Sequence, residues 1–327
     1  MIEQKEEFMR MSTMVTGGTG FIFSRLVRKL VEQGEEVVVF DISPNFKFIA
    51  DIRDKIRFIQ GDITHLDELI DAIKTHDVEY IYNAAALLSG ICHVVPVRAV
   101  HVNGVGMVNV LEASRLMDVK KILFTSSIAV FTGSQGDVYD DTSKYPISPY
   151  GALKLLGELY GLWYQRTYGL DFRGVRYPLL YGAGDPYAYH AMSRLIENPA
   201  LGKPVELPIK SDRKGNWLYV KDAVNATMLV LNADESKVKT RVYNIEGETC
   251  SFQEVAEIIR KMIPDAVITF TEKGIPSSGL FKGTCLKEEL QWKPLYTIEE
   301  GVKETIEEIR GRPDLYSKGV FRKDKLI

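Results

Sequence analysis

The chain has 327 residues, 45% of them hydrophobic, and a formal net charge of −3. This length can bury a large core, in one large domain or two smaller ones. The balanced charge, without a basic stripe, argues against nucleic-acid binding, and no apolar run reaches the roughly 18 residues that a membrane span needs. The three cysteines and five histidines show neither a disulfide pattern nor metal-ligand spacing, so we expect no metal. These features indicate a soluble, cytoplasmic protein with reduced cysteines.

The first structural feature is a glycine-rich turn at residues 16–20. It follows a polar stretch, residues 1–11, which we expect to be a flexible leader rather than a signal peptide. Gly17 and Gly20 have the spacing of a turn that opens a helix, here residues 21–33, and such a helix N-terminus binds a pyrophosphate. The backbone of Phe21 and Ile22 would take part. The same spacing predicts a third glycine where the chain has Phe23.

An apolar run at residues 36–41 predicts a buried parallel strand that ends in Asp41. In dinucleotide-binding folds, an acid at this distance from the glycine turn hydrogen-bonds the adenine-ribose hydroxyls and repels a 2′-phosphate. Taken alone, Asp41 could equally be a surface turn residue. The glycine turn upstream favours the ribose role.

Strands and helices continue to alternate as far as residue 180. Strands are expected at residues 56–60, 78–83, 121–126 and 171–177, and helices at residues 66–74, 96–117 and 149–168. This order predicts an α/β fold of the Rossmann type, a doubly wound parallel sheet whose ligands bind at the carboxyl ends of the strands. The residues at those ends include Gly17, Gly20, Asp41, Asp62, Ala84, Ala85, Ser127, Tyr177 and Pro178.

We expect two domains. The nucleotide-binding Rossmann domain spans residues 12–180, and residues 215–262 partly return to it through a strand at 242–245. A smaller C-terminal α/β lobe for substrate comes from residues 181–214 and 263–315. Helices are expected at residues 251–263, where Ser251 and Glu254 form a capping box, and at residues 298–309. Residues 316–327 are a tail, and the charged stretch 311–327 is expected to fray.

Tyr150 and Lys154 lie four residues apart on the predicted helix 149–168 and therefore share one face. A tyrosine is a poor base at neutral pH because its reference pKa is about 10. An ammonium one turn away and an oxidised nicotinamide would stabilise the phenolate, which could then accept a proton from a substrate hydroxyl. Ser127, after the preceding strand, could hold the same oxygen. The alternative is an ordinary amphipathic helix, which the ordered context of strand, serine and helix disfavours.

Taken in order, these segments resemble an extended short-chain dehydrogenase/reductase, the NAD-dependent epimerase/dehydratase family. The resemblance covers residues 13–310. It is carried by residues 16–22, Asp41, 61–63, 83–86, 103–104, 126–127, Tyr150, Lys154, 176–178, 219–223 and 290–294.

The resemblance implies a tightly held NAD, a Ser/Thr-Tyr-Lys triad of Ser127, Tyr150 and Lys154, and a smaller substrate domain. By position, Asp62 and Ile63 would flank the adenine and Asn103 would brace the active site. It also implies a homodimer through helices 96–117 and 149–168, which could instead pack within the monomer. The cofactor-binding set is then Gly17, Gly20, Phe21, Ile22, Asp41, Asp62, Ile63, Ala84, Ala85, Asn103, Tyr150, Lys154, Tyr177 and Pro178.

Three departures from the nucleotide-sugar epimerases narrow the substrate. Those enzymes usually carry an amide where Leu179 stands and an arginine where Gly215 stands, and residues 282–285 replace their D-x-S-[KR] element. Arg213 or Lys282 could substitute for the missing contacts. Residues 86–89 and 176–178 resemble instead the L-threonine dehydrogenases of the family, which oxidise a small hydroxy amino acid. Ser89 would then touch the substrate beside Ser127 and Leu179, or be an ordinary loop serine.

We therefore expect an NAD-dependent oxidoreductase or epimerase that transfers hydride at a secondary alcohol of a small hydroxy acid, amino acid or sugar. One alternative is a nucleotide-sugar 4-epimerase or dehydratase. Another is a non-catalytic NAD-binding sensor or scaffold, which Phe23 keeps open because its ring must displace the helix or turn into a neighbouring pocket. The complete triad argues against that last reading.

Two further groups of residues are expected to play no part in the chemistry. Asp140 and Asp141 form a carboxylate pair that we expect to be solvated in a loop. Trp163, Tyr164 and Tyr168 are expected in the core or at a dimer interface rather than as a stacking platform.

Overall fold

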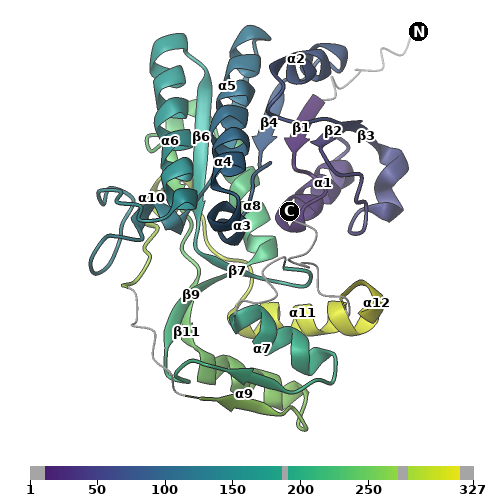
Figure 1. The fold of residues 1–327 in the computed structure, drawn as a ribbon, viewed down its shortest axis with the longest axis vertical. Coiled ribbons are helices and arrows are strands. Elements are labelled where there is room, and N and C mark those ends of the chain that lie inside the picture. The colour runs from purple at the N-terminus through teal and green to yellow at the C-terminus, as the bar shows by residue number, and fades with distance from the viewer. Residues whose placement is uncertain (1–11, 186–190, 272–278, 317–327) are drawn as a thin grey trace, which may run out of the picture.

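The computed structural model describes residues 12–185, 191–271 and 279–316. The expected leader and the part of the tail beyond Tyr316 lie outside the described residues. The described chain forms a larger layered α/β body and a smaller lobe, which lies below it in Figure 1.

The larger body is built on a parallel sheet of seven strands in the order β10-β6-β5-β4-β1-β2-β3, which confirms the predicted Rossmann-type fold. The chain passes from β1 to β2 on one side and later fills the other side with β4, so a topological switch point lies beside β1. Ligands of open sheets bind at such a point. The strands are β1 (Ser12–Thr16), β2 (Glu36–Asp41), β3 (Ile56–Gln60), β4 (Tyr80–Asn83), β5 (Lys121–Ser127), β6 (Asp171–Tyr177) and β10 (Val242–Asn244).

Helices cover both faces of this sheet. Successive strand residues alternate between two cores: Val15 and Val39 pack on the side of α1 and α8, whereas Met14 and Val38 pack on the side of α2, α5 and α6. Because both faces are buried, these strands appear in the sequence as continuous apolar runs. The helices are α1 (Phe21–Glu32), α2 (Leu66–Thr75), α5 (Met107–Leu116), α6 (Pro149–Tyr168) and α8 (Val220–Asn232).

The helix predicted over residues 96–117 is not a single α-helix. It consists of α4 (Pro96–Ala99), a π-helical segment (Val100–Gly106) and α5. The wider π turn carries Asn103 inward, where its side chain is buried. Segments of this kind are rare and are frequent at functional sites.

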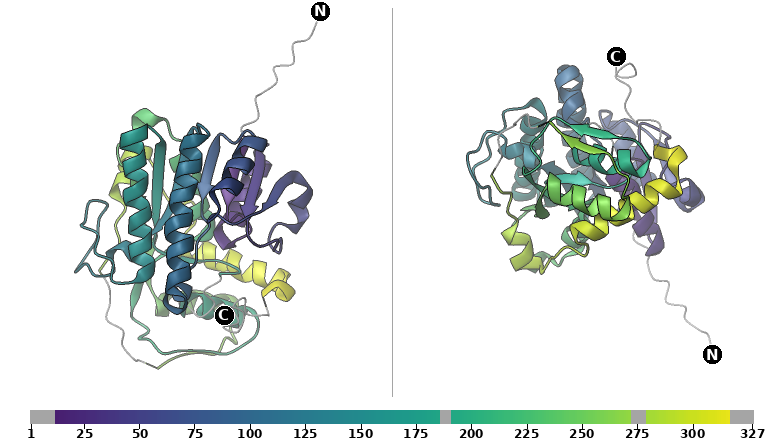
Figure 2. Two further views of the ribbon diagram at one scale, coloured as in Figure 1. Left: turned by 45° about the horizontal axis from the view of Figure 1, so that its top comes forward. Right: turned by 90° about the horizontal axis from the view of Figure 1, so that it is seen from below.

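The smaller lobe has its own hydrophobic core between two short sheets and a layer of helices, seen from below in Figure 2, right. The α8 and β10 elements return to the main body, whereas β9 and α9 pack in this lobe. Its elements are β7 (Leu179–Tyr181), α7 (Ala191–Ala200), β8 (Val205–Leu207), β9 (Lys214–Tyr219), β11 (Glu248–Ser251), α9 (Phe252–Met262), β12 (Ile268–Phe270), α11 (Ile298–Gly311) and α12 (Pro313–Tyr316).

The capping box of Ser251 and Glu254 is confirmed at the start of α9. Fraying from residue 311 is wrong for the described part of that stretch. Tyr316 is buried, its ring stacks on Phe48, and its hydroxyl donates to Glu308 at 2.7 Å. This contact lies between segments far apart in the sequence, so the charge of the terminal stretch gave no sign of it.

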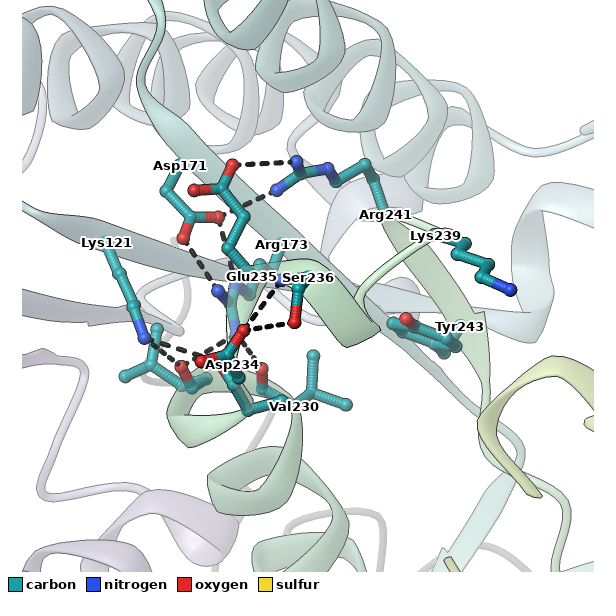
Figure 3. A network of polar contacts seen from close by, with 12 residues as sticks. Lys121, Asp171, Arg173, Val230, Asp234, Glu235, Ser236, Lys239, Arg241 and Tyr243 are labelled. Carbon is teal, nitrogen blue, oxygen red and sulfur yellow. Dashed lines mark hydrogen bonds and ion pairs between the residues drawn. The ribbon is translucent and has the colours of Figure 1, made fainter. Parts of the chain in front are cut away.

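A buried arginine joins the amino end of β6 to the C-terminus of α8 (Figure 3). The Arg173 side chain is inaccessible to solvent, and its Nε and Nη2 donate to Asp171 at 2.9 and 2.7 Å. Its Nη1 donates, at 2.8, 3.0 and 2.7 Å, to the carbonyl oxygens of Val230, Leu231 and Ala233. Carbonyls at a helix C-terminus have no partner within the helix and favour a cation. Arg173 therefore fixes α8 to the end of the sheet opposite the glycine turn.

Candidate active site

The glycine turn lies between the ends of β1 and β4. Gly17 has a φ of +68°, and a Cβ added there would lie 3.0 Å from the backbone of Ala85, so only glycine fits. Gly20 is the N-cap of α1, and no side chain caps that helix. The first N–H groups of α1, which begins with Phe21 and Ile22, therefore have no helical partner and offer a site for an anion.

Asp41 ends β2 beside this turn. Its carboxylate accepts hydrogen bonds from the N–H and hydroxyl of Thr19, at 3.1 and 2.7 Å, and from the N–H of Ser43, at 3.0 Å. These bonds fix the carboxylate next to the helix N-terminus. Thr19 was not among the predicted site residues, although it lies inside the glycine motif.

The adenine pair predicted from the resemblance lies after β3. Asp62 accepts a hydrogen bond from the Thr64 N–H at 2.9 Å, which makes a tight turn. The Ile63 side chain is buried, and a Cβ on Gly106 of the π segment would lie only 2.7 Å from it. Ile63 therefore packs on the π segment as part of the core, and its contact with a cofactor would come from the backbone.

The loop after β4 is tied to both neighbouring elements. The Thr16 hydroxyl accepts from the N–H groups of Ala84 and Ala85, both at 3.1 Å. Asn103 clamps the same loop through Leu87, accepting from its N–H at 2.7 Å and donating to its carbonyl at 2.8 Å. Asn103 thus braces the loop. The role of Thr16 was not predicted from the sequence, because it depends on the packing of β1 against β4.

Ser127, Tyr150 and Lys154 meet at the carboxyl end of β5. Tyr150 lies in the first turn of α6, which begins with a Ser148 cap and Pro149, and its phenol lies near enough to Ser127 for the serine to lower its pKa. Lys154 follows one turn later, with Nζ 5.5 Å from the centroid of the Tyr150 ring. Nζ also donates to the Thr125 carbonyl oxygen at 2.7 Å. The structure therefore brings the three predicted residues together.

Burial shifts the pKa values of this pair toward the neutral forms. Lys154 is 4% exposed, and burial lowers the pKa of its ammonium to about 8, while Cys92 and Glu158 act in the opposite direction. Burial raises the pKa of the Tyr150 phenol above its ordinary value, with a smaller contribution from Cys92, and the hydrogen bond with Ser127 lowers it. A negative charge on Tyr150 thus depends on positive charge held beside it.

The ring of Phe23 is accommodated by the core. It is buried in the cluster that also contains Val27, Tyr82 and Tyr177. Of the two sequence-based alternatives, the ring turns into a neighbouring apolar pocket, and α1 keeps its place at the glycine turn.

The remaining predicted residues line the end of β6 and its surroundings. The Tyr177 hydroxyl bonds to Thr227 of α8 at 2.6 Å, so its ring is directed into the core and only its backbone is available for a cofactor. Pro178 is buried, whereas Leu179 at the start of β7 is 40% exposed. Ser89 is the first residue of α3 (Ser89–Val94) and is half-buried.

The solvated role expected for Asp140 is wrong. Asp140 is buried, and its carboxylate accepts from the N–H of Asn244 at 2.7 Å. It also accepts from the N–H groups of Thr284 and Cys285, at 3.1 and 3.2 Å, where α10 (Thr284–Leu290) begins. The donors come from residues more than 100 positions away in the chain, so the local loop pattern could not reveal them.

The residue pair Glu158 and Arg176 was also missed as part of the site. Both are buried, and they form a two-bond ion pair behind Lys154. A signal was present in the sequence: Glu158 lies on α6 at the same four-residue interval from Lys154 as Lys154 does from Tyr150.

The comparisons place the chain in a family. The model of the NAD dependent epimerase/dehydratase family matches residues 13–247. The chain belongs to this family. It is therefore an enzyme of the extended short-chain dehydrogenase/reductase type, and its cofactor is NAD. The glycine turn, the uncapped N-terminus of α1 and the Asp41 carboxylate fit that cofactor.

Its relatives include both epimerases and dehydrogenases. The UDP-glucose 4-epimerase of Halalkalibacterium halodurans is 30% identical over 317 residues, which cover 90% of this chain and 94% of that protein. The structure of the Thermotoga maritima UDP-glucose 4-epimerase with UDP-glucose has a TM-score of 0.81 at 28% identity and covers 93% of this chain and 100% of its own. The L-threonine dehydrogenase from Clostridium difficile has a TM-score of 0.82 at 26% identity, over 95% and 99%.

The described part of this family member has neither a metal-ion cluster nor a membrane-spanning helix. Residues 12–185, 191–271 and 279–316 contain no group of three or more His, Cys, Asp or Glu side chains placed to hold a metal ion. Among the same residues, no helix is both long and apolar enough to cross a membrane.

Proposed function

We propose that this enzyme transfers hydride from a secondary alcohol of a small hydroxy acid, amino acid or sugar to NAD. The observation that carries the proposal is that Ser127, Tyr150 and Lys154 lie together at the carboxyl end of β5, on the same edge of the sheet as the glycine turn. When bound, NAD supplies the hydride acceptor.

Each residue of the triad has a distinct task. Tyr150 accepts the proton of the substrate hydroxyl as the carbon beneath it loses hydride. Ser127, which lies beside Tyr150, holds the same substrate oxygen in line. Lys154 supplies a positive charge that stabilises the buried phenolate. Burial alone raises the pKa of Tyr150 and so opposes formation of the phenolate.

The surroundings of the site favour a small substrate over a nucleotide diphosphate. Leu179 presents an apolar side chain at the start of β7, where nucleotide-sugar epimerases of the family usually have an amide. Lys282, one of the two cations that could replace the missing diphosphate contacts, is paired with Glu246 at 3.0 Å. The Asn216 side chain is already hydrogen-bonded to the backbone of Gly247. It donates to the Gly247 carbonyl oxygen at 3.0 Å and accepts from the Gly247 N–H at 2.8 Å.

A second candidate is a nucleotide-sugar 4-epimerase or dehydratase. It is favoured by the names of two relatives, both UDP-glucose 4-epimerases. Arg213, just before β9, is the residue through which this lobe would bind a diphosphate in that case. A purely sensory or scaffolding role has less support, because the family consists of enzymes and the triad is complete.

One experiment separates the two candidates. The protein is incubated with NAD and either UDP-glucose or a panel of small hydroxy acids, hydroxy amino acids and sugars, and NADH absorbance is followed. The proposal expects net NADH from a small compound and none from UDP-glucose. Isomerisation of the sugar nucleotide without net NADH would overturn it in favour of the epimerase.

We also propose a homodimer through helices 96–117 and 149–168. These helices stand side by side along one face of the molecule, blue and teal in Figure 2, left. Their outward residues include several large apolar side chains, as is common where a protein surface binds a partner. The exposed side chains are Val97, Val100, Val105, Leu159, Tyr160 and Trp163.

Sedimentation analysis tests the dimer. Leu159→Glu places a charge within the proposed contact and is expected to give a monomer. Val267→Glu, at an exposed apolar residue of the smaller lobe, is the matched control and should leave the mass unchanged. A wild-type protein that sediments as a monomer at micromolar concentration would overturn this proposal.

A further inference from the structure

A buried acid lies one helical turn beyond the lysine of the triad. Glu158 is 2% exposed and Lys154 is 4% exposed, and their spacing places both on the face of α6 that packs on β5. The Ser126 hydroxyl donates to Glu158 at 2.5 Å. Consecutive residues at the end of β5 thus face three turns of α6: Thr125 binds Lys154, Ser126 binds Glu158, and Ser127 lies beside Tyr150.

Arg176 of β6 fixes the orientation of this acid. Its Nε and Nη2 each donate to one carboxylate oxygen of Glu158 at 2.8 Å. Its Nη1 donates to Asn244 at 3.1 Å, which anchors the guanidinium from the next strand. Two parallel bonds between a guanidinium and a carboxylate constrain direction as well as distance. The Glu158 side chain therefore has one position.

The charges around Glu158 are predominantly positive. Arg176 faces it from β6, Lys154 from its own helix, and Lys144 from the loop before α6. Around Lys154, Cys92 and then Glu158 oppose the burial that favours the neutral amine. Burial raises the pKa of the Cys92 thiol, so the carboxylate charge on this side of Lys154 comes from Glu158. Removal of that charge would leave the burial of Lys154 less opposed.

We propose that Glu158, held by Arg176 and Ser126, is a positioning residue that keeps Lys154 in its ammonium form beside Tyr150. This inference rests on the proposed function, in which the Lys154 charge stabilises the phenolate. It extends the working unit of the site from three residues to five, with Glu158 and Arg176 acting through Lys154 and not touching the substrate.

The test measures the ionisation of Lys154 directly in the resting protein. Protein labelled with ¹³C at the lysine ε-carbon is titrated by NMR, and the Lys154 signal is assigned by its loss in Lys154→Met. In Glu158→Gln the Lys154 pKa is expected to fall by about one unit, because an opposite charge nearby is worth one to three units. An unchanged Lys154 pKa in this folded variant would overturn the proposal.

Glu112→Gln is the matched control. Glu112 also contacts α6, where it accepts from the Tyr164 hydroxyl at 3.0 Å, but it has no place in the network at Lys154. It should leave the Lys154 titration as in the wild type. An equal shift in this control would mean that Glu158 acts through general charge and not through its position.

A second variant covers a failure of Glu158→Gln to fold. In Glu158→Leu/Arg176→Met an apolar pair of similar volume replaces the ion pair, a change that proteins often tolerate. The Lys154 pKa should again fall, but by less than in Glu158→Gln, because the Arg176 charge has gone too. An unchanged value here also contradicts the proposal.

Turnover gives an independent readout. With a substrate that yields NADH, the alkaline limb of the rate profile should move to lower pH in Glu158→Gln, whereas a merely structural role would lower the rate equally at every pH. Because the NMR titration uses no substrate, its failure is distinct from a failure of the proposed hydride transfer.

Discussion

Strand β6 carries two buried arginines, one toward each end, and they are satisfied in different ways. Arg173, at the amino end, binds three backbone carbonyls of the α8 terminus and its neighbour Asp171. Arg176, at the carboxyl end, binds mainly the side chains of Glu158 and Asn244, and one backbone carbonyl, that of Asp140. Both arginine side chains are buried, so burial does not distinguish them.

The difference lies in what each cation is connected to. Backbone carbonyls at a helix end need a donor whatever the chemistry of the protein, so Arg173 serves the architecture. Glu158 has a carboxylate whose charge reaches Lys154, so Arg176 serves the site through it. The two ends of one strand thus separate stability from function, in agreement with the rule that ligands bind at the carboxyl ends.

The largest expected effect on the reaction rate is at Tyr150, in the site at the carboxyl ends of the strands. Tyr150→Phe should lower the rate of NADH formation by about 10²- to 10⁴-fold, the usual contribution of a general base. Its melting temperature should stay close to that of the wild type, because only a hydroxyl is removed. A variant that keeps its rate would show that the proton is accepted elsewhere.

At the amino end, Arg173→Met should lower the free energy of unfolding by about 3–5 kcal/mol, the cost of breaking a buried ion pair. Asp171 would keep one partner, Arg241, at 2.9 Å, which places the cost toward the lower value. Denaturant unfolding measures it, and the rate per folded molecule should be unchanged. Lost activity without lost stability would erase the proposed division between the two ends.

Lys154 should show the reverse pattern, in which a functional group costs stability. Its pKa is about 8 in the folded chain against 10.5 as reference, so between these values the unfolded state binds more protons and folding gains with rising pH. The wild type should gain about 1.4 kcal/mol of unfolding free energy per pH unit relative to Lys154→Met over that window. Denaturant unfolding of both proteins at pH 8 and 9 checks this. A constant difference would mean that Lys154 is not the titrating group.

The smallest effect is expected within the amino-end network itself. Lys121 reaches the carbonyls of Leu231 and Ala233 at only 3.5 and 3.4 Å, and Arg173 already binds both more closely. Lys121→Met should therefore cost less than about 1 kcal/mol. Thermal unfolding beside Arg173→Met gives the comparison, and similar losses in the two variants would show that Arg173 has no special place.

The sequence predicted whatever depends on local pattern. Strand and helix alternation gave the parallel sheet, a residue spacing of three gave the capping box of Ser251, and a spacing of four put Tyr150 and Lys154 on one face. The order of these patterns also gave the family.

It did not predict what depends on distant partners. Asp140 looks solvated until Asn244 and α10 supply its donors, and Tyr316 looks frayed until Phe48 covers it. The π segment at 100–106 continues the helical pattern on either side of it, and its packing against Ile63 and Leu87 is visible only in the structure. Phe23 is the same kind of case, since the room for its ring comes from the surrounding core.

The most direct test of the central claim follows the hydride itself. The small hydroxy compound that gives the strongest NADH signal is prepared with deuterium on the carbon that bears the hydroxyl, and the cofactor is analysed by mass spectrometry after reaction. We predict reduced cofactor that carries one deuterium, formed far more slowly in Tyr150→Phe. Reduced cofactor without deuterium would contradict a direct hydride transfer from this carbon.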